Sequence, residues 1–333
     1  MFELLGICLI LAAALTLNTI AALIASALWR SLRGRALEWP AETRASLIFT
    51  LRVFPPVIAI ISVATLLLPA YITHEPRREV EPVSLKLGIL AAISALGLLL
   101  AFWRGVQAWI VTRRLTEDWL SCAEPINFDQ LGIPAYRLRH RFPVIAIVGA
   151  VRTKLFIADH LFESLTREEI AAAIAHENGH LASRDNLKRA LLGACRYGLA
   201  IVPNGRSLDR AWAEASEAAA DEFASRSGSY VALELASALV KIARLVPEGT
   251  RPAMPSGALL IGDSADEIAK RVRRLTQLAA HENISTARRS VIFKFWSLPI
   301  LAATSVSLIM LATDPSTLLA IHNLIEFAVS KLQ

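Results

Sequence analysis

Cysteine is scarce in this sequence, and several signatures of other protein classes are missing. Only 3 of the 333 residues are cysteines, at Cys8, Cys122 and Cys195, and none has C-x-x-C spacing. This scatter excludes a disulfide framework and a zinc knuckle, and it predicts free thiols. There is no glycine-rich phosphate loop and no internal repeat, and the net charge of +6 needs no nucleic-acid partner.

Charge is also low, whereas apolar residues are abundant. Charged residues make up 19% of the chain, hydrophobic residues make up 54%, and the mean hydropathy is +0.47. This composition is too apolar for an ordinary soluble enzyme. The runs long enough to cross about 30 Å of hydrocarbon are Leu4 to Trp29, Val53 to Tyr71, Val83 to Trp103 and Phe295 to Thr313. The sequence therefore predicts a multi-pass membrane protein with four transmembrane helices.

The first apolar run is expected to be a retained anchor and not a secretory signal. Its apolar stretch is too long, no basic region precedes it, and no small-residue cleavage site is convincing. The distribution of arginine predicts the orientation of all four runs. Arginines that follow the first and third runs or precede the fourth are Arg30, Arg33, Arg35, Arg44, Arg52, Arg104, Arg113, Arg114, Arg288 and Arg289. The positive-inside rule then places both termini outside a bacterial-type cytoplasmic membrane.

This orientation divides the chain into four parts. Residues 1–103 hold three transmembrane helices with a basic cytoplasmic loop, and residues 104–290 form a cytoplasmic domain. Residues 291–313 hold the fourth transmembrane helix. Residues 314–333 form a short extracytoplasmic tail, expected to be an amphipathic helix.

The most informative motif is His176-Glu177-Asn178-Gly179-His180. Two histidines four residues apart on a helix project from one face and can hold one metal ion, and this geometry suits zinc. Glu177 is one residue round the helix, where it can take the proton of a water activated by the metal. The motif predicts peptide-bond hydrolysis.

The residues around the motif predict a helix independently. Thr166 and Glu169 form a capping box at its start, and nothing breaks the pattern before about Leu192. The alternative interpretation is an alanine-rich core helix with two satisfied surface histidines. The apolar segment from Leu191 to Pro203 is only 13 residues long and contains Arg196. The zinc hypothesis forbids a single membrane crossing there.

Candidates for a third zinc ligand lie on a second predicted helix, from Ser207 to Arg226. Glu217 and Asp221 share a face at i, i+4, so one could bind zinc while the other orients a histidine. Glu214 is the runner-up ligand. A solvated helix face is the better expectation for Asp209 and Glu222.

Taken in order, these motifs resemble the membrane zinc metallopeptidases of the BlaR/MecR antirepressor type, a gluzincin group. More distantly, they are similar to the HtpX and CAAX prenyl endopeptidase group. The resemblance covers roughly Arg141 to Asp221 and is carried by Ala175 to His180, Arg184 to Leu187, Pro203 and Glu217 to Asp221. It implies that Glu217 is the third ligand of one Zn²⁺ ion, and that Asp221 and Asp185 support the ligands.

The resemblance also implies a fold and a function. The expected fold is mainly α, with a cytoplasmic α+β zincin-like domain that contains a small sheet. The expected substrate is a protein, and the resemblance suggests a transcriptional repressor. The alternatives are a quality-control protease for membrane proteins and a non-proteolytic membrane signal transducer. There are two departures from the pattern of the group: Ala220 stands in place of a frequent cysteine, and no large sensor domain follows the last span. The second departure argues against antibiotic sensing.

Further expectations concern the rest of the catalytic domain. Pro143 to Ala158 predicts a hairpin or two short strands, either an ordinary structural hairpin or a platform that binds substrate as an added strand. Asp266 to Leu278 predicts a basic helix whose arginines face solvent by default, although Arg271 resembles part of an Arg-Ile-x-x-Leu pattern of the relatives. Candidates for stabilising an oxyanion are Tyr230, Arg271 and His281. The oligomeric state is not predicted.

Overall fold

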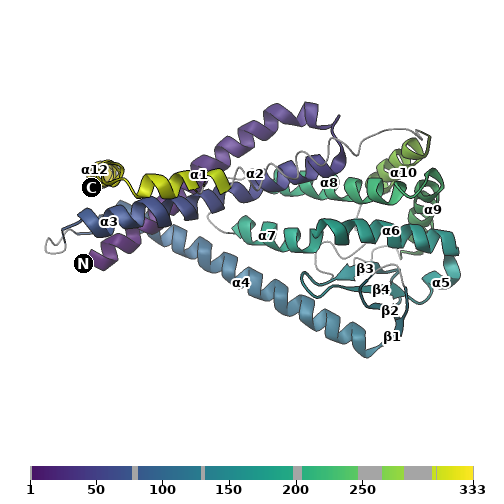
Figure 1. The fold of residues 1–333 in the computed structure, drawn as a ribbon. Helices are drawn as coiled ribbons and strands as arrows, with labels where there is room; N and C mark the ends of the chain where they lie inside the picture. Colours follow the sequence, from purple (N-terminus) through teal and green to yellow (C-terminus); the bar gives the residue numbers. More distant parts are fainter. Residues whose placement is uncertain are drawn as a thin grey trace.

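The fold comes from a computed structural model, which describes residues 2–76, 82–128, 132–197, 205–246, 265–280, 302–304 and 306–332. Long helices form one end of the molecule, and a small sheet with shorter helices forms the other (Figure 1). The predicted loop at Pro247 to Asp263 and His281 lie outside the described residues.

Among the described residues, three helices are long and apolar enough to cross a membrane, which confirms the first three predicted spans. The first is α1, Phe2–Ala36. The second runs from Ala41 to His74 through α2 (Ala41–Ser62), a π-helical turn η1 (Val63–Leu67) and α3 (Leu68–His74), and the third is α4, Leu85–Ser121. Only 17–28% of their most apolar windows is buried inside the protein, so most of these side chains are available to lipid.

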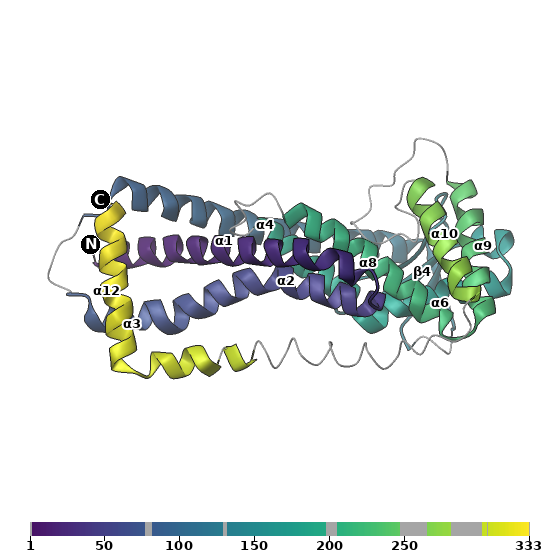
Figure 2. The same cartoon turned by 90° about the horizontal axis from the view of Figure 1, so that it is seen from above.

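The fourth predicted span is only partly described. Residues 295–301 and 305 lie outside the described part, and Ala302–Ala312 is helical where it is described. Helix α12, Pro315–Leu332, follows it as predicted and lies across the end of the bundle formed by α1, α3 and α4 (Figure 2). The described part of the chain therefore has three membrane-capable helices, or four if Ala302–Ala312 and Pro315–Lys331 together are one bent span.

Helix α4 does not end where the third span was predicted to end. It continues past Trp103 to Ser121 and leads directly into the first strand. The predicted boundary between residues 103 and 104 therefore falls inside one continuous helix. One continuous helix therefore connects the long apolar helices to the part that contains the sheet.

The sheet has four strands in the order β1-β2-β4-β3. They are β1 (Ala123–Ile126), β2 (Ala135–Leu138), β3 (Ile145–Val148) and β4 (Lys154–Ala158); β2 and β4 are parallel and the other pairs antiparallel. The predicted hairpin is confirmed as β3 and β4. Its turn needs Gly149, whose φ is +101° and where a Cβ would lie 2.6 Å from the Arg152 carbonyl oxygen.

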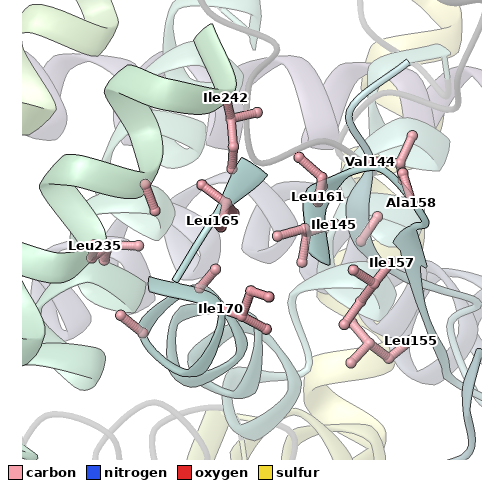
Figure 3. Close-up of a cluster of buried hydrophobic side chains, with 14 of the residues drawn as sticks. Val144, Ile145, Leu155, Ile157, Ala158, Leu161, Leu165, Ile170, Leu235 and Ile242 are labelled. Atoms are coloured by element: carbon pink, nitrogen blue, oxygen red, sulfur yellow. The ribbon is translucent and has the colours of Figure 1, made fainter. Parts of the chain in front are cut away.

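The remaining helices pack on the sheet and on each other. Those described are α5 (Leu161–Ser164), α6 (Arg167–Ser183), α7 (Asp185–Tyr197), α8 (Gly205–Ser225), α9 (Ser229–Leu245) and α10 (Ala265–Ala280). The core of this part lies between the sheet, α6 and α9, where side chains such as Ile157, Ile170 and Leu235 meet (Figure 3). Burial of this cluster stabilises the platform that carries the motif helix.

The motif helix begins as predicted and ends earlier than predicted. The Thr166–Glu169 capping box is present, with both of its hydrogen bonds. The expectation of an unbroken helix to about Leu192 is wrong, because Arg184 adopts a left-handed conformation with φ of 54° and separates α6 from α7. Asp185 follows this break directly and turns back toward the motif.

A buried ion pair joins one of the long apolar helices to α8. Arg52 Nε on α2 donates to Asp209 Oδ1 on α8 at 3.1 Å, and both side chains are buried. The expectation that Asp209 and Glu222 form a solvated face is therefore wrong for Asp209. Glu222 accepts from the backbone nitrogen of Ala41 and pairs with Arg274. Helix α8 is thus fixed against α2 by its acidic residues.

Candidate metal centre

The centre forms because α6 and α8 approach each other closely at Gly179. A Cβ at this position would lie 3.0 Å from the Cα of Ala220, which is tighter than ordinary van der Waals contact. Glycine on one helix and alanine on the other therefore permit the approach. The small side chain of Ala220 is buried in this contact.

This packing brings together the three predicted ligands from two separate helices. Ligand atoms of His176, His180 and Glu217 all lie within 4.8 Å of one another. His176 Nε2 lies 3.5 Å from Glu217 Oε2, and His180 Nε2 lies 3.5 Å from Glu217 Oε1. The two rings are nearly perpendicular, with centroids 4.8 Å apart. The group faces one common point.

Each histidine is oriented by a carboxylate on its other ring nitrogen. His176 Nδ1 lies 2.9 Å from Asp221 Oδ1, and His180 Nδ1 lies 2.8 Å from Asp185 Oδ2. A carboxylate on Nδ1 fixes the proton there and leaves Nε2 as the electron-pair donor. Both residues predicted to support the ligands are thus in contact with the histidines.

The electrostatics of the group keep its carboxylates ionised. Burial opposes the charge on Glu217, but His180, His176 and Arg271 outweigh burial and hold the pKa of Glu217 well below 4.5. Burial also opposes charge on Asp221, yet Arg271 and His176 lower the pKa of that carboxyl to about 2. Burial disfavours a charged His180, whereas the carboxylates of Glu217 and Asp185 raise its pKa to about 10. The group strongly attracts positive charge.

The donor set fits a zinc ion. Zinc in proteins accepts histidine nitrogen and glutamate oxygen, and a catalytic site has three protein ligands with a further position open to substrate. Glu217 Oε2 is buried and has no hydrogen-bond partner among the described residues, although Arg271 Nη1 lies 3.3 Å away. A cation held between the three residues would satisfy this oxygen.

Glu177 lies between the metal centre and the edge of the sheet. It is 5% exposed, and its Oε2 accepts a hydrogen bond from the backbone nitrogen of Ile147 on β3 at 3.2 Å. Burial raises the pKa of Glu177 above 4.5, with a smaller contribution from Glu217, although His180 and His176 counteract it. A carboxylate with a raised pKa is a stronger base than an exposed one.

Several residues at the centre were not assigned a role from the sequence. Ser216 donates to Asp185 at 2.6 Å, and Arg189 Nη2 donates to Glu217 Oε1 at 3.2 Å. Asn186 Nδ2 donates to the carbonyl oxygens of Ile147 and Gly149, which fastens α7 to β3. Of these residues, only Asn186 could have been noticed in the sequence, because it lies in the Arg184 to Leu187 segment that carries the family resemblance.

The other candidates are placed as follows. Arg271 is buried and not solvent-facing, contrary to expectation, and it binds Asp221 with two nitrogens. Glu214 is exposed on α8 and is not part of the metal-ligand group. Tyr230 is 63% exposed at the start of α9. Of the three oxyanion candidates, only Arg271 lies at the metal centre in the part of the chain that is described.

A His-His-Glu group with a glutamate beside its first histidine, on helices packed over a small sheet, defines a metallopeptidase. The chain matches peptidase family M48 over residues 113–324 and belongs to this family, whose members depend on zinc. The match begins within α4 and ends within α12. No curated protein and no solved structure matches the chain. The predicted resemblance is confirmed at the level of the family, and the antirepressor subgroup stays a prediction.

Proposed function

We propose that the chain is an integral-membrane zinc endopeptidase that hydrolyses peptide bonds of a protein substrate at the cytoplasmic face. One observation carries this proposal. His176, His180 and Glu217 converge on one point, each histidine has a carboxylate on its far nitrogen, and Glu177 lies beside them. Buried groups of this kind are costly unless they bind a cation.

In the proposed reaction, His176, His180 and Glu217 bind one zinc ion. Zinc bound there supplies the positive charge that acidifies water and polarises a peptide carbonyl. Glu177 accepts the proton of the attacking water through its carboxylate and later donates a proton to the leaving amine. Asp221 and Asp185 hold the two imidazoles in the orientation that this chemistry needs.

Strand β3 is the proposed platform for the substrate. It is one of the two edge strands of the sheet as described, and the Ala158 N–H donates to the Val144 C=O just before it. Hydrogen-bonded and non-hydrogen-bonded pairs alternate in antiparallel strands, so the N–H and C=O groups of Ile145 and Ile147 point away from β4. The Ile147 N–H already contacts Glu177. The Ile147 C=O already accepts from Asn186 Nδ2. Main-chain pairing with an extended substrate is therefore proposed for Ile145, and a substrate added there passes beside the base.

The proposed location follows from the arginine distribution. Residues 104–290 form the cytoplasmic catalytic domain, both termini lie outside, and the membrane is a bacterial-type cytoplasmic membrane. By its resemblance, the substrate is a transcriptional repressor. Misfolded membrane proteins are the alternative substrate class.

The test compares the purified full chain with three variants in lipid nanodiscs. We expect Glu177→Gln to retain zinc, because it keeps the ligands, while cleavage of an unfolded protein such as casein falls by about 10²–10⁴-fold. Glu217→Ala is expected to lose both zinc and cleavage. Glu214→Ala is the matched control, an exposed acid one turn away on the same helix, and it should retain both.

A parallel measurement identifies the substrate. New protein N-termini are compared between cells with the wild-type chain and cells with Glu177→Gln. A cut repressor or a set of cut membrane proteins distinguishes the two substrate classes. A Glu177→Gln chain that still cleaves, or wild-type cells with no additional N-termini, contradicts the endopeptidase proposal and favours a non-proteolytic transducer.

A further inference from the structure

A second group of metal-ligating side chains lies far from the catalytic centre, and we name it the distal cluster. It consists of Glu75, just after α3, and His322 and Glu326 on α12. Helices α3 and α12 meet at one end of the molecule, whereas α6 and the sheet lie at the other (Figures 1 and 2). The distal cluster shares no residue with the catalytic centre.

The geometry of the distal cluster is that of three donors around one point. Ligand atoms of Glu75, His322 and Glu326 lie within 4.8 Å of one another. His322 Nδ1 is 3.8 Å from Glu75 Oε2, and these side chains are 14% and 6% exposed. Ligands bound to one zinc ion at about 2.0–2.2 Å lie roughly 3 to 3.5 Å apart, so the group needs only a small contraction.

The burial of His322 distinguishes this cluster from a surface ion pair. Its Nδ1 atom is inaccessible to solvent and forms no hydrogen bond with any described residue. Burying a polar atom without a hydrogen bond costs free energy. The atom faces a buried carboxylate at 3.8 Å, which is too long for a hydrogen bond and leaves space for a shared cation.

The surrounding packing holds the three side chains in place. Ile321, Ile325 and Val329 recur at helical spacing and belong to the apolar cluster through which α12 packs on α3 and η1, so His322 and Glu326 next to them are fixed toward Glu75. The ring of His74 stacks on that of His322, with centroids 5.7 Å apart. His74 Nδ1 contacts the Ala70 carbonyl oxygen. The donors are thus preorganised by apolar contacts that do not depend on an ion.

We propose that the distal cluster binds a divalent transition-metal ion. One imidazole nitrogen and two carboxylates form a mixed donor set that suits ions such as Zn²⁺, Co²⁺ or Mn²⁺. The bound ion joins α12 to the end of the helix that runs from Ala41 to His74. It therefore fastens the C-terminal helix to the membrane bundle, independently of catalysis.

The test measures metal binding by the purified full chain without an affinity tag. In the His176→Ala, His180→Ala background, which removes the catalytic ligands, we expect one Zn²⁺ to remain bound at equilibrium with a zinc buffer. Adding His322→Gln or Glu75→Gln should weaken this binding by about 10-fold or more, since each removes a ligand. His160→Gln is the matched control and should leave binding unchanged.

Two further measurements keep the proposal falsifiable if a variant folds poorly. Co²⁺ in the same background should give ligand-field absorption that Glu75→Gln abolishes, and Zn²⁺ should raise the unfolding temperature only when the distal cluster is intact. Circular dichroism verifies that each variant is folded. A background chain that binds no zinc, or zinc binding that is insensitive to both distal substitutions, overturns the proposal. Neither result bears on cleavage by the wild-type chain.

Discussion

At the scale of single residues, the two histidines of the metal centre have matching environments. Asp221 contacts Nδ1 of His176 and Asp185 contacts Nδ1 of His180. The two carboxylates differ in their other partners, since Asp221 also binds Arg271 and Asp185 accepts from Ser216. Each fixes one tautomer, so both are expected to matter for metal affinity.

We therefore predict that Asp185→Asn and Asp221→Asn each lower zinc affinity by about 10–100-fold. Asp221→Asn should also lower the unfolding temperature more, because it leaves the buried Arg271 guanidinium without a charged partner at that position. Affinity is measured by competition with a chelator. Asp118→Asn, at an exposed position on α4, is the control and should keep the zinc affinity of the wild type. If Asp185→Asn and Asp221→Asn also keep it, these two carboxylates do not support the zinc ligands.

Much of the centre was predictable at this scale. His176, Glu177 and His180 were singled out by their spacing, and the structure brings the two histidines to the Glu217 carboxylate. Ser216 and Arg189 were not predictable, because their contacts depend on the crossing of α7 and α8. No local sequence pattern predicts that Ser216 on α8 contacts Asp185, which follows the break between α6 and α7.

At the scale of elements, the approach of α6 to α8 at Gly179 controls the centre. We predict that Gly179→Val forces the helices apart, because its Cβ would lie 3.0 Å from backbone of the facing helix. Overpacking of this kind costs about 1–3 kcal/mol. Zinc affinity should fall together with the unfolding temperature, as measured by chelator competition and thermal unfolding.

Gly193→Val on α7 is the matched control for this prediction. It places the same β-branched residue in a helix, but nothing lies within 4 Å of its Cβ. Both variants therefore share the cost in helix propensity. If Gly193→Val lowers zinc affinity as much as Gly179→Val, then close packing of α6 on α8 is not what aligns Glu217.

The start of α6 predicts a dependence of stability on pH. Burial opposes the charge on Glu169, but Lys241, Ser237 and the Thr166 backbone outweigh it and lower the pKa of Glu169 below 4.5. A carboxyl whose pKa is lower in the folded than in the unfolded state stabilises the fold at pH values above its unfolded-state pKa. This stabilisation is lost as the pH falls through the folded-state pKa. The contribution is thus complete near neutral pH.

We expect Glu169→Gln to remove this contribution while keeping a residue that a capping box accepts. The difference in unfolding temperature between wild type and variant should be largest near neutral pH and should shrink as the pH falls below 4.5. Thermal unfolding across this range measures it. A difference that grows toward acidic pH would contradict the role of the Glu169 carboxylate.

Element boundaries were only partly predictable. The capping box fixed the start of α6, since it is a local pattern. The break at Arg184 was missed because nothing local demands it; Arg184 is not a glycine, yet it adopts a left-handed conformation. The contacts of Asp185 with His180 and Ser216 depend on this break, so tertiary interactions stabilise a conformation that the sequence disfavours.

At the scale of the whole molecule, the proposed orientation predicts which cysteine reacts from each side. Cys122 is exposed just after α4, within the proposed cytoplasmic domain. With Cys8 and Cys195 replaced by alanine, we expect Cys122 to be unreactive toward a membrane-impermeant maleimide on intact spheroplasts and reactive after lysis. Labelling is measured by gel shift.

The matched control places a single cysteine on the proposed extracytoplasmic side of the membrane. In a chain with Cys122→Ala, Ala320→Cys on α12 puts an exposed thiol in the proposed extracytoplasmic tail. This variant should react on intact spheroplasts. The opposite pattern, with Cys122 labelled before lysis and Ala320→Cys labelled only afterwards, would reverse the proposed topology.

The apolar spans, the start of the motif helix and the spacing of its candidate ligands could be predicted from the sequence alone, because spans, caps and i, i+4 spacing depend on residues near one another in the chain. Strands β1 and β2, the break at Arg184 and the burial of Asp209 against Arg52 were decided only by the tertiary structure. These features depend on which surfaces meet. Glu217 reaches the histidines because α8 packs on α6 and α2 at the same time, and such packing follows from shape and burial over the whole chain.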